Sequence, residues 1–241
     1  MKQKYTYVWV SLIILVFGII FIPKIVQRVK EGTVVKNDRI NLKDNSQELA
    51  YILLNGKKRR VPTFSFVDQD SLLITDKDYK GKVFVVEFFF TSCPSICPIM
   101  TNNLITLQEE FGGSNQFGIA SFSITPEYDT PQVLKEYAEK HGITDMNWHL
   151  MTGNVEDVFE LANSGFNIYA AEAPNVPGGF EHSGLFALVD KKGYLRSRVD
   201  DYGNPIVYYR GAITVGERQN EEGETEQMTA LKEDIIKLLN E

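Results

Sequence analysis

The stretch "KVFVVEFFFTSCPSICPIM", residues 82–100, decides the fold. Its first half is a nearly continuous apolar run, which is typical of a strand buried on both faces of a sheet. Its second half holds Cys93 and Cys97, the only two cysteines of the chain, and leads into a helical pattern. The sequence therefore predicts a buried strand followed by a helix, with both thiols at the junction.

The segments around this stretch predict alternating strands and helices. The predicted elements are a hairpin at 63–75, a second buried strand at 117–124, a helix at 130–142, a short strand at "NWHLMTG", a helix beginning near Asn154, an antiparallel hairpin at 184–199 and a final amphipathic helix at 228–241. Parallel strand–helix units followed by an antiparallel pair indicate an α/β thioredoxin-like fold, a mixed sheet flanked by helices. Residues 201–227, polar and rich in Gly and Glu, are predicted to be an inserted loop.

Charge and cysteine content exclude several classes of protein. The chain of 241 residues has a net charge of −7, and residues 61–241 carry 28 acidic against 13 basic side chains. An acidic domain argues against a nucleic-acid partner, whose phosphates require a basic surface. Two cysteines are too few for a disulfide-rich scaffold or for a four-ligand zinc site.

The N-terminal segment predicts a membrane anchor. Residues 5–23 contain no charge, which is about the length that crosses a bilayer, and Lys2 and Lys4 precede them. We interpret residues 1–23 as an uncleaved transmembrane signal anchor, and a cleaved signal peptide with an atypical site as the alternative. The single-pass anchor would hold the domain on the extracytoplasmic side of the cytoplasmic membrane. Residues 24–60, with "GKKRR" at 56–60, then form a charged tether, and contact with anionic lipid is the second interpretation.

Cys93 and Cys97 have more than one chemical use. Cys97 is expected in the first helical turn, where unpaired N–H groups and the helix dipole stabilise a thiolate. Two thiolates at this spacing can close into a disulfide, with Cys93 attacking and Cys97 resolving, or they can bracket a soft metal ion. The C-x-x-x-C spacing alone does not separate these uses.

A histidine ligand would favour the metal. We interpret His141, at the end of an acidic helix, and His149, in the short strand, as structural. His182 precedes the strand at 184–190, which in a thioredoxin-like sheet runs antiparallel to 83–90, so His182 is expected near Cys93. Two thiolates and one imidazole suit Cu(I). Met100 and Met151 are interpreted as core residues, although they could be soft auxiliary ligands.

The sequence resembles the Sco/SenC family of membrane-anchored, thioredoxin-like copper proteins that assist maturation of cytochrome c oxidase. The matching motifs are "TSCPSICP", "SITPEYDTPQVLKEYAE", "NWHLMTG" and "EHSGLFALVDKKG". The resemblance implies that Cys93, Cys97 and His182 hold Cu(I) or Cu(II), with the copper-carrying oxidase subunit as acceptor and other copper carriers or thiol reductants as further partners. Thr125 and Phe89 depart from the family, which commonly has Asp and Gly at these positions.

Three hypotheses follow. The favoured one is a copper-binding assembly factor for the oxidase, and not primarily an enzyme. The first alternative is a thiol–disulfide oxidoreductase that uses Cys93 and Cys97 to reduce partner cysteines, and the second is a peroxiredoxin-like peroxidase. His182 distinguishes them, because a copper site requires it and a redox pair does not.

Overall fold

The structure is a computed structural model that describes residues 11–12, 15–17, 23, 48–173, 175, 178–200, 203–220 and 223–241. The chain divides into two units, residues 1–46 and residues 47–241. The described residues of the first unit are helical, but most of the expected anchor lies outside the described residues. Across the described part of the chain, no helix is long and apolar enough to cross a membrane.

The second unit begins earlier than the sequence indicated. Residues 50–58, which the expected tether included, form three short strands instead. The first of these, β1 (Ala50–Tyr51), pairs with β12 (Leu195–Ser197) at the edge of the sheet. Only two residues of β1 take part, so the pairing leaves no alternating pattern long enough to be recognised in the sequence.

The elements predicted from the sequence occur in the predicted order, and the short strands at 53–58, 170–172 and 180–182 and the helical turn at 76–79 are additional. The remaining elements of this unit are β2 (Leu53–Leu54), β3 (Lys57–Lys58), β4 (Ser65–Asp68), β5 (Leu73–Thr75), η2 (Asp76–Tyr79), β6 (Val83–Phe89), α2 (Ile96–Phe111), β7 (Phe117–Ser123), α3 (Pro131–His141), β8 (Trp148–Thr152), α4 (Val155–Phe159), η3 (Glu160–Phe166), β9 (Ala170–Glu172), β10 (Phe180–His182), β11 (Leu185–Val189), β13 (Tyr209–Arg210) and α5 (Met228–Asn240).

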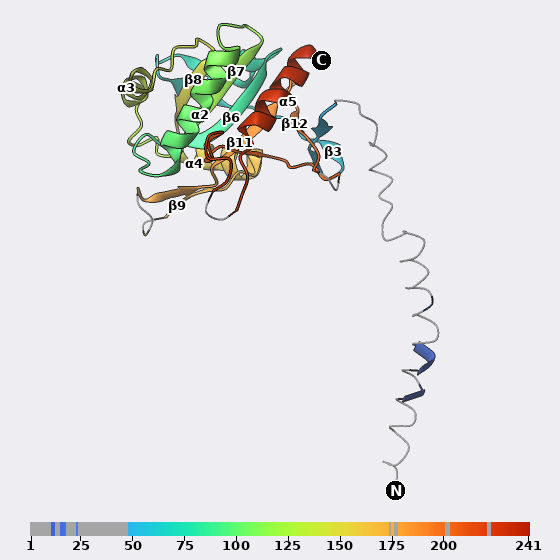
Figure 1. Cartoon of the computed structure of the whole chain (residues 1–241). Coiled ribbons are helices and arrows are strands. Elements are labelled where there is room, and N and C mark those ends of the chain that lie inside the picture. The colour runs from blue at the N-terminus through green and yellow to red at the C-terminus, as the bar shows by residue number, and fades with distance from the viewer. Residues whose placement is uncertain are drawn as a thin grey trace. The chain divides into compact units, whose positions relative to one another are not determined.

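The main sheet is mixed, as the thioredoxin-like interpretation requires (Figure 1). Within the described residues its order is β1-β12-β11-β6-β7-β8-β4-β5, and β13 also pairs with β11. β6, β7 and β8 run parallel to one another, whereas β11 runs antiparallel to β6 with Ala187 opposite Val86. The start of β11 therefore lies beside the end of β6, which is the arrangement that the sequence predicted for the metal site.

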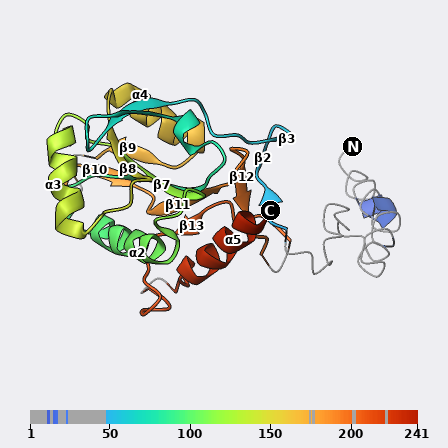
Figure 2. The ribbon, with the colours of Figure 1, turned by 90° about the horizontal axis from the view of Figure 1, so that it is seen from above.

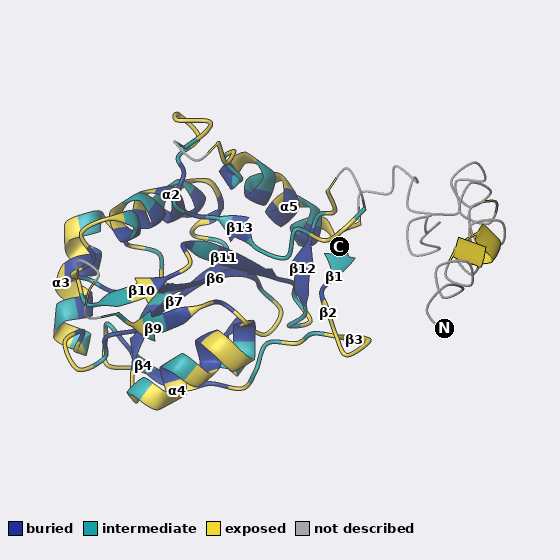
Figure 3. Cartoon of the chain, turned by 90° about the horizontal axis from the view of Figure 1, so that it is seen from below, coloured by how far each residue is buried: buried dark blue, intermediate teal, exposed yellow. Residues whose placement is uncertain are grey.

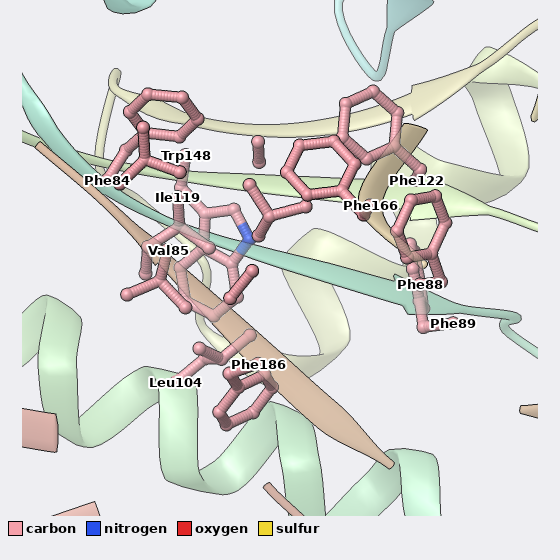
Figure 4. Packing of buried hydrophobic residues seen from close by; sticks show 14 of the residues in the cluster. Phe84, Val85, Phe88, Phe89, Leu104, Ile119, Phe122, Trp148, Phe166 and Phe186 are labelled. Atoms are coloured by element: carbon pink, nitrogen blue, oxygen red, sulfur yellow. The ribbon is translucent and has the colours of Figure 1, made fainter. Parts of the chain in front are cut away.

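Helices cover both faces of the sheet. Figure 2 shows α2 and α5 on one side of the sheet and α4 on the other. All seven residues of β6 are buried, as are all seven of β7, because these central strands are covered on both faces. The side chains around β6 interlock into one core (Figure 4), and the burial pattern places the exposed positions on the outer sides of the helices (Figure 3).

The inserted segment is partly built into the domain. Its apolar stretch before the Glu-rich loop is not all loop, because β13 pairs with β11. Tyr209 of β13 is fully buried, and its hydroxyl donates to the Asp234 carboxylate of α5 at 2.8 Å. The hydroxyl of the neighbouring Tyr208 donates to the Phe166 carbonyl. The insertion is thereby held against two sides of the core.

Candidate metal centre

The two cysteines occupy the junction between β6 and α2. β6 ends at Phe89, so Cys93 lies in the connecting loop, while Cys97 is the second residue of α2. The loop curls back until the Cys93 sulfur accepts the backbone N–H of Cys97 at 3.5 Å. This N–H is one of those that a helix N-terminus leaves without an intrahelical partner. Since the Ser95 side chain makes no capping hydrogen bond, the sulfur of Cys93 takes over that role.

His182 is delivered to the cysteines by a small hairpin rather than by the loop that the sequence indicated. It is the last residue of β10, which pairs antiparallel with β9 and sets His182 opposite Ala170. The Phe90 ring lies edge-on to the imidazole, with centroids 5.9 Å apart, and also packs against Phe180. These aromatic contacts therefore pack the hairpin against the end of the strand that leads to the cysteines.

The three side chains converge as the sequence predicted. Their ligand atoms lie within 4.8 Å of one another, and the Cys97 sulfur is 3.0 Å from His182 Nε2. The site is shielded from solvent, with exposed fractions of 8% for Cys93, 1% for Cys97 and 9% for His182. Neither cysteine is in a disulfide. The arrangement thus has two free sulfurs and one ring nitrogen directed at a common point.

The two thiols are electrostatically unequal. The hydrogen bond from Cys97 lowers the pKa of Cys93 to about 3, and His182 and the backbone N–H groups of Ser95 and Cys97 contribute in the same direction against burial. Sharing a proton with Cys93 raises the pKa of Cys97, and burial adds to the effect. Cys93 is therefore the more acidic thiol of the pair, and Cys97 loses its proton less readily.

A buried carboxylate holds the cysteine loop in place. Asp129, 1% exposed, accepts the backbone N–H of Thr91 at 3.1 Å and also its hydroxyl. The hydroxyls of Ser123 and Thr125 donate to the same carboxylate at 2.6 and 2.9 Å. Thr125, where the family commonly has Asp, thus supplies a donor in place of a second negative charge. The sequence did not indicate this role of Asp129.

Sequence reasoning missed a second buried acid, Glu87. It stands in the middle of β6 with 2% exposure, and burial raises its pKa to about 7. Ser121 donates to Oε1 at 2.6 Å and in turn accepts the Trp148 indole N–H at 3.0 Å, while Oε2 has no hydrogen-bond partner among the described residues. The available signal was a single acidic residue inside an otherwise apolar strand.

The other candidate ligands lie elsewhere, as expected. His149 Nδ1 contacts the Asp68 carboxylate at 2.8 Å. The His141 ring lies 4.3 Å from that of Tyr137. Burial and the nearby Lys140 lower the pKa of His141. Met100 and Met151 are fully buried core residues.

The donor set fits copper. Thiolates are soft ligands that select Cu(I), and an imidazole also suits Cu(II). Two sulfurs and one nitrogen are one ligand short of the closed four-ligand zinc site. Because the donors come from the helix start and from a hairpin packed on the same strand, the protein supplies the site already assembled.

The comparisons with known proteins agree with this class of metal-binding, thioredoxin-like domain. The SCO1/SenC family model matches residues 54–212, so the chain belongs to the SCO1/SenC family. It is 33% identical over 135 residues to the SCO1 protein homolog of Bacillus subtilis, covering 55% of this chain and 69% of that protein. It is 29% identical over 153 residues to a putative copper-binding protein of Stutzerimonas stutzeri, covering 62% and 74%.

Solved structures of the same family share the fold. The crystal structure of a SCO1/SenC family lipoprotein from Bacillus anthracis has a TM-score of 0.59 and 29% identity, with 75% of this chain and 95% of that chain covered. BsSco, described as a member of the Sco family of cytochrome c oxidase assembly proteins with a disulfide switch, has a TM-score of 0.59 and 26% identity, with coverage of 75% and 94%.

Proposed function

We propose that this protein is a copper-binding assembly factor that helps to mature the copper site of cytochrome c oxidase. The observation that carries the proposal is the convergence of Cys93, Cys97 and His182 within 4.8 Å. These residues would hold Cu(I) or Cu(II), and the bound ion is the cargo that the protein passes to the acceptor. Membership of the SCO1/SenC family supports the proposal that the acceptor is the oxidase subunit that carries copper.

The protein's own residues prepare this site in three ways. The start of α2 and the lowered pKa of Cys93 keep one sulfur ready to bind metal near neutral pH. The hydrogen bonds of Asp129 fix the loop that carries that sulfur. The aromatic contacts of Phe90 fix the hairpin that carries the imidazole.

Copper titration of residues 47–241, followed by metal analysis and absorption spectra, tests the proposal. Cys93→Ser and Cys97→Ser should each abolish stable one-to-one binding, because only one thiolate remains for the soft ion. His182→Ala should retain weak Cu(I) binding but lose the Cu(II) state, which depends on the imidazole nitrogen. His141→Ala, which changes a histidine outside the site, should behave as the wild type. A wild-type domain that binds no copper under reducing conditions would refute the proposal.

The thiol–disulfide oxidoreductase remains the second candidate, because of the low pKa of Cys93 beside the less acidic Cys97. This function predicts rapid disulfide exchange with a test substrate and little effect of His182→Ala. The peroxidase has less support, since a peroxidatic cysteine uses a nearby arginine. In the described part of the chain, the hydrogen-bond partners of Cys93 are Ser95, Cys97 and His182.

The membrane anchor is part of the proposal. Residues 5–23 are uncharged and follow two lysines, so we expect them to hold the domain on the outer side of the cytoplasmic membrane. Protease added to intact spheroplasts should remove the domain. Protection of the domain, or its release by mild washing, would contradict the single-pass anchor.

A further inference from the structure

The hairpin of β2 and β3 combines exposed apolar and basic side chains. Leu53 and Leu54 are 55% and 52% exposed. Asn55 and Gly56 join the strands with φ angles of 51° and 75°, the left-handed pair that a tight two-residue turn requires. Lys57 and Lys58 follow on the exposed return strand. Two leucines are thus presented to solvent directly beside two lysines.

A basic groove lies next to this hairpin. Its volume is about 600 Å³, and it lies between the segment before β4, η2 and the β11–β12 turn. One carboxylate, Asp76, is among its lining residues. The lining cations are Arg60, Lys77, Lys80, Lys191 and Lys192. Such a concentration of positive charge contrasts with the acidic remainder of the domain.

Tyr194 joins the hairpin to the groove. The Arg60 guanidinium lies 5.0 Å from the centre of its ring, and Lys58 Nζ lies 6.0 Å from it and 3.3 Å from the ring of Tyr51. The tyrosine rings contact each other edge-on at 5.7 Å. The leucines, lysines and tyrosines therefore form one continuous surface, which we call the basic face: Tyr51, Leu53, Leu54, Lys57, Lys58, Arg60, Lys77, Lys80, Lys191, Lys192 and Tyr194.

The basic face is at the far end of β6 from the metal site. Its groove residues precede Val83 at the start of β6 or follow Val189 at the end of the antiparallel β11. Cys93 follows the opposite end of β6, a strand of seven residues, about 23 Å long at the usual rise. Figures 1 and 2 show β2 and β3 at the border of the domain beyond β12.

We propose that the basic face docks the folded domain onto an anionic phospholipid bilayer. Lysines near a negatively charged bilayer are attracted to it, and leucines gain from entering its interface. Tyrosines favour the headgroup level. An acidic protein partner would account for the cations but not for the two exposed leucines beside them. The leucines therefore favour a lipid bilayer. Because the rest of the domain is acidic, only this face is attracted, and the copper site is turned toward the aqueous side and its acceptor.

The domain of residues 47–241 can be tested without the N-terminal segment, because its hydrophobic core lies entirely between Leu49 and Leu238. We expect it to sediment with vesicles of phosphatidylglycerol and phosphatidylcholine but not with vesicles of phosphatidylcholine alone. Binding should decrease steeply as salt is raised, since salt screens exposed charges.

Two matched pairs of variants test the face itself. Lys77→Gln/Lys80→Gln should weaken vesicle binding by on the order of tenfold. Lys135→Gln/Lys232→Gln removes the same charge from lysines outside the face and should have little effect. Leu54→Trp should show a shift of fluorescence to shorter wavelength on adding phosphatidylglycerol vesicles. Leu73→Trp, which is equally solvent-facing but lies on β5 at the other edge of the sheet, should not.

Several results would overturn the proposal. The first is equal binding to both kinds of vesicle, and the second is an equal loss of vesicle binding in the two double-lysine variants. The others are an unshifted fluorescence spectrum for Leu54→Trp and binding to acidic polypeptides without binding to vesicles. Copper stoichiometry should be unchanged in all four variants, which separates failure of docking from failure of the proposed copper function. Near-wild-type free energies of unfolding would show that the variants are folded.

Discussion

Polar side chains are buried at one end of strand β6 and exposed at the other. Beyond its C-terminal end, Cys97, His182 and Asp129 are buried and hydrogen-bonded to one another or to the loop. Before its N-terminal end, Lys77, Lys80 and Lys192 are exposed. The first end can hold one ion in a fixed geometry, whereas the second suits a broad surface of opposite charge. Changes at the buried end should therefore affect stability and copper binding, and changes at the exposed end should affect neither.

Removal of the carboxylate that fixes the cysteine loop should have the largest effect. Asp129→Ala leaves one backbone N–H and three hydroxyls without their acceptor, so we expect it to lower the free energy of unfolding by about 3 kcal/mol. Copper affinity should also fall, because Thr91 is no longer tied to β7. Urea unfolding and copper titration measure the two effects.

Asp70→Ala is the control for that experiment. Asp70 is exposed and pairs with Lys135 at 3.1 Å, and an exposed ion pair contributes less than about 1 kcal/mol. An equal decrease in the free energy of unfolding for Asp129→Ala and Asp70→Ala would contradict the contrast between buried and exposed polar groups.

Glu87 predicts a decrease in stability as pH rises. Its pKa is raised from 4.5 to about 7 in the fold by burial, so the folded state binds more protons than the unfolded state between these values. The free energy of unfolding should fall through this window by on the order of 3 kcal/mol. Glu87→Gln, which is always neutral, should flatten the profile and be more stable than the wild type at pH 8.

Urea unfolding at several pH values measures this profile, with Glu109→Gln as the control, since Glu109 is exposed on α2. The same slope in Glu87→Gln as in the wild type would assign the pH dependence to another group.

The smallest effect is expected outside both ends of β6. Residues 216–226 belong to the Glu-rich part of the insertion and include no large apolar side chain. Deleting them should leave copper stoichiometry unchanged, because β13 on the preceding side and α5 on the following side are packed on the core. Metal analysis of the deletion variant measures this. Loss of copper would mean that the loop closes over the site.

Local patterns in the sequence were sufficient for most of the fold. The apolar run before Cys93 predicts the central strand, and the predicted helix at 130–142 begins at the Thr130 N-cap and Pro131 and ends at Gly142. These signals lie within a few residues of the structure they specify. The antiparallel pairing of β11 with β6 follows from the order of the elements, and this order predicts that His182 lies near the cysteines.

The sequence by itself determined the three candidate donor residues, the thioredoxin-like order and the family resemblance, because these depend on residue type and spacing. Only the tertiary structure decided that Cys93 precedes the helix and caps it, that β9 and β10 carry His182, and that Glu87 and Asp129 are buried beside the site. It also decided that residues 50–60 belong to the domain and join Lys77, Lys80 and Lys192 on one face. Apart from the Cys93 cap, these features arise from contacts between segments far apart in the chain, and no local pattern encodes them.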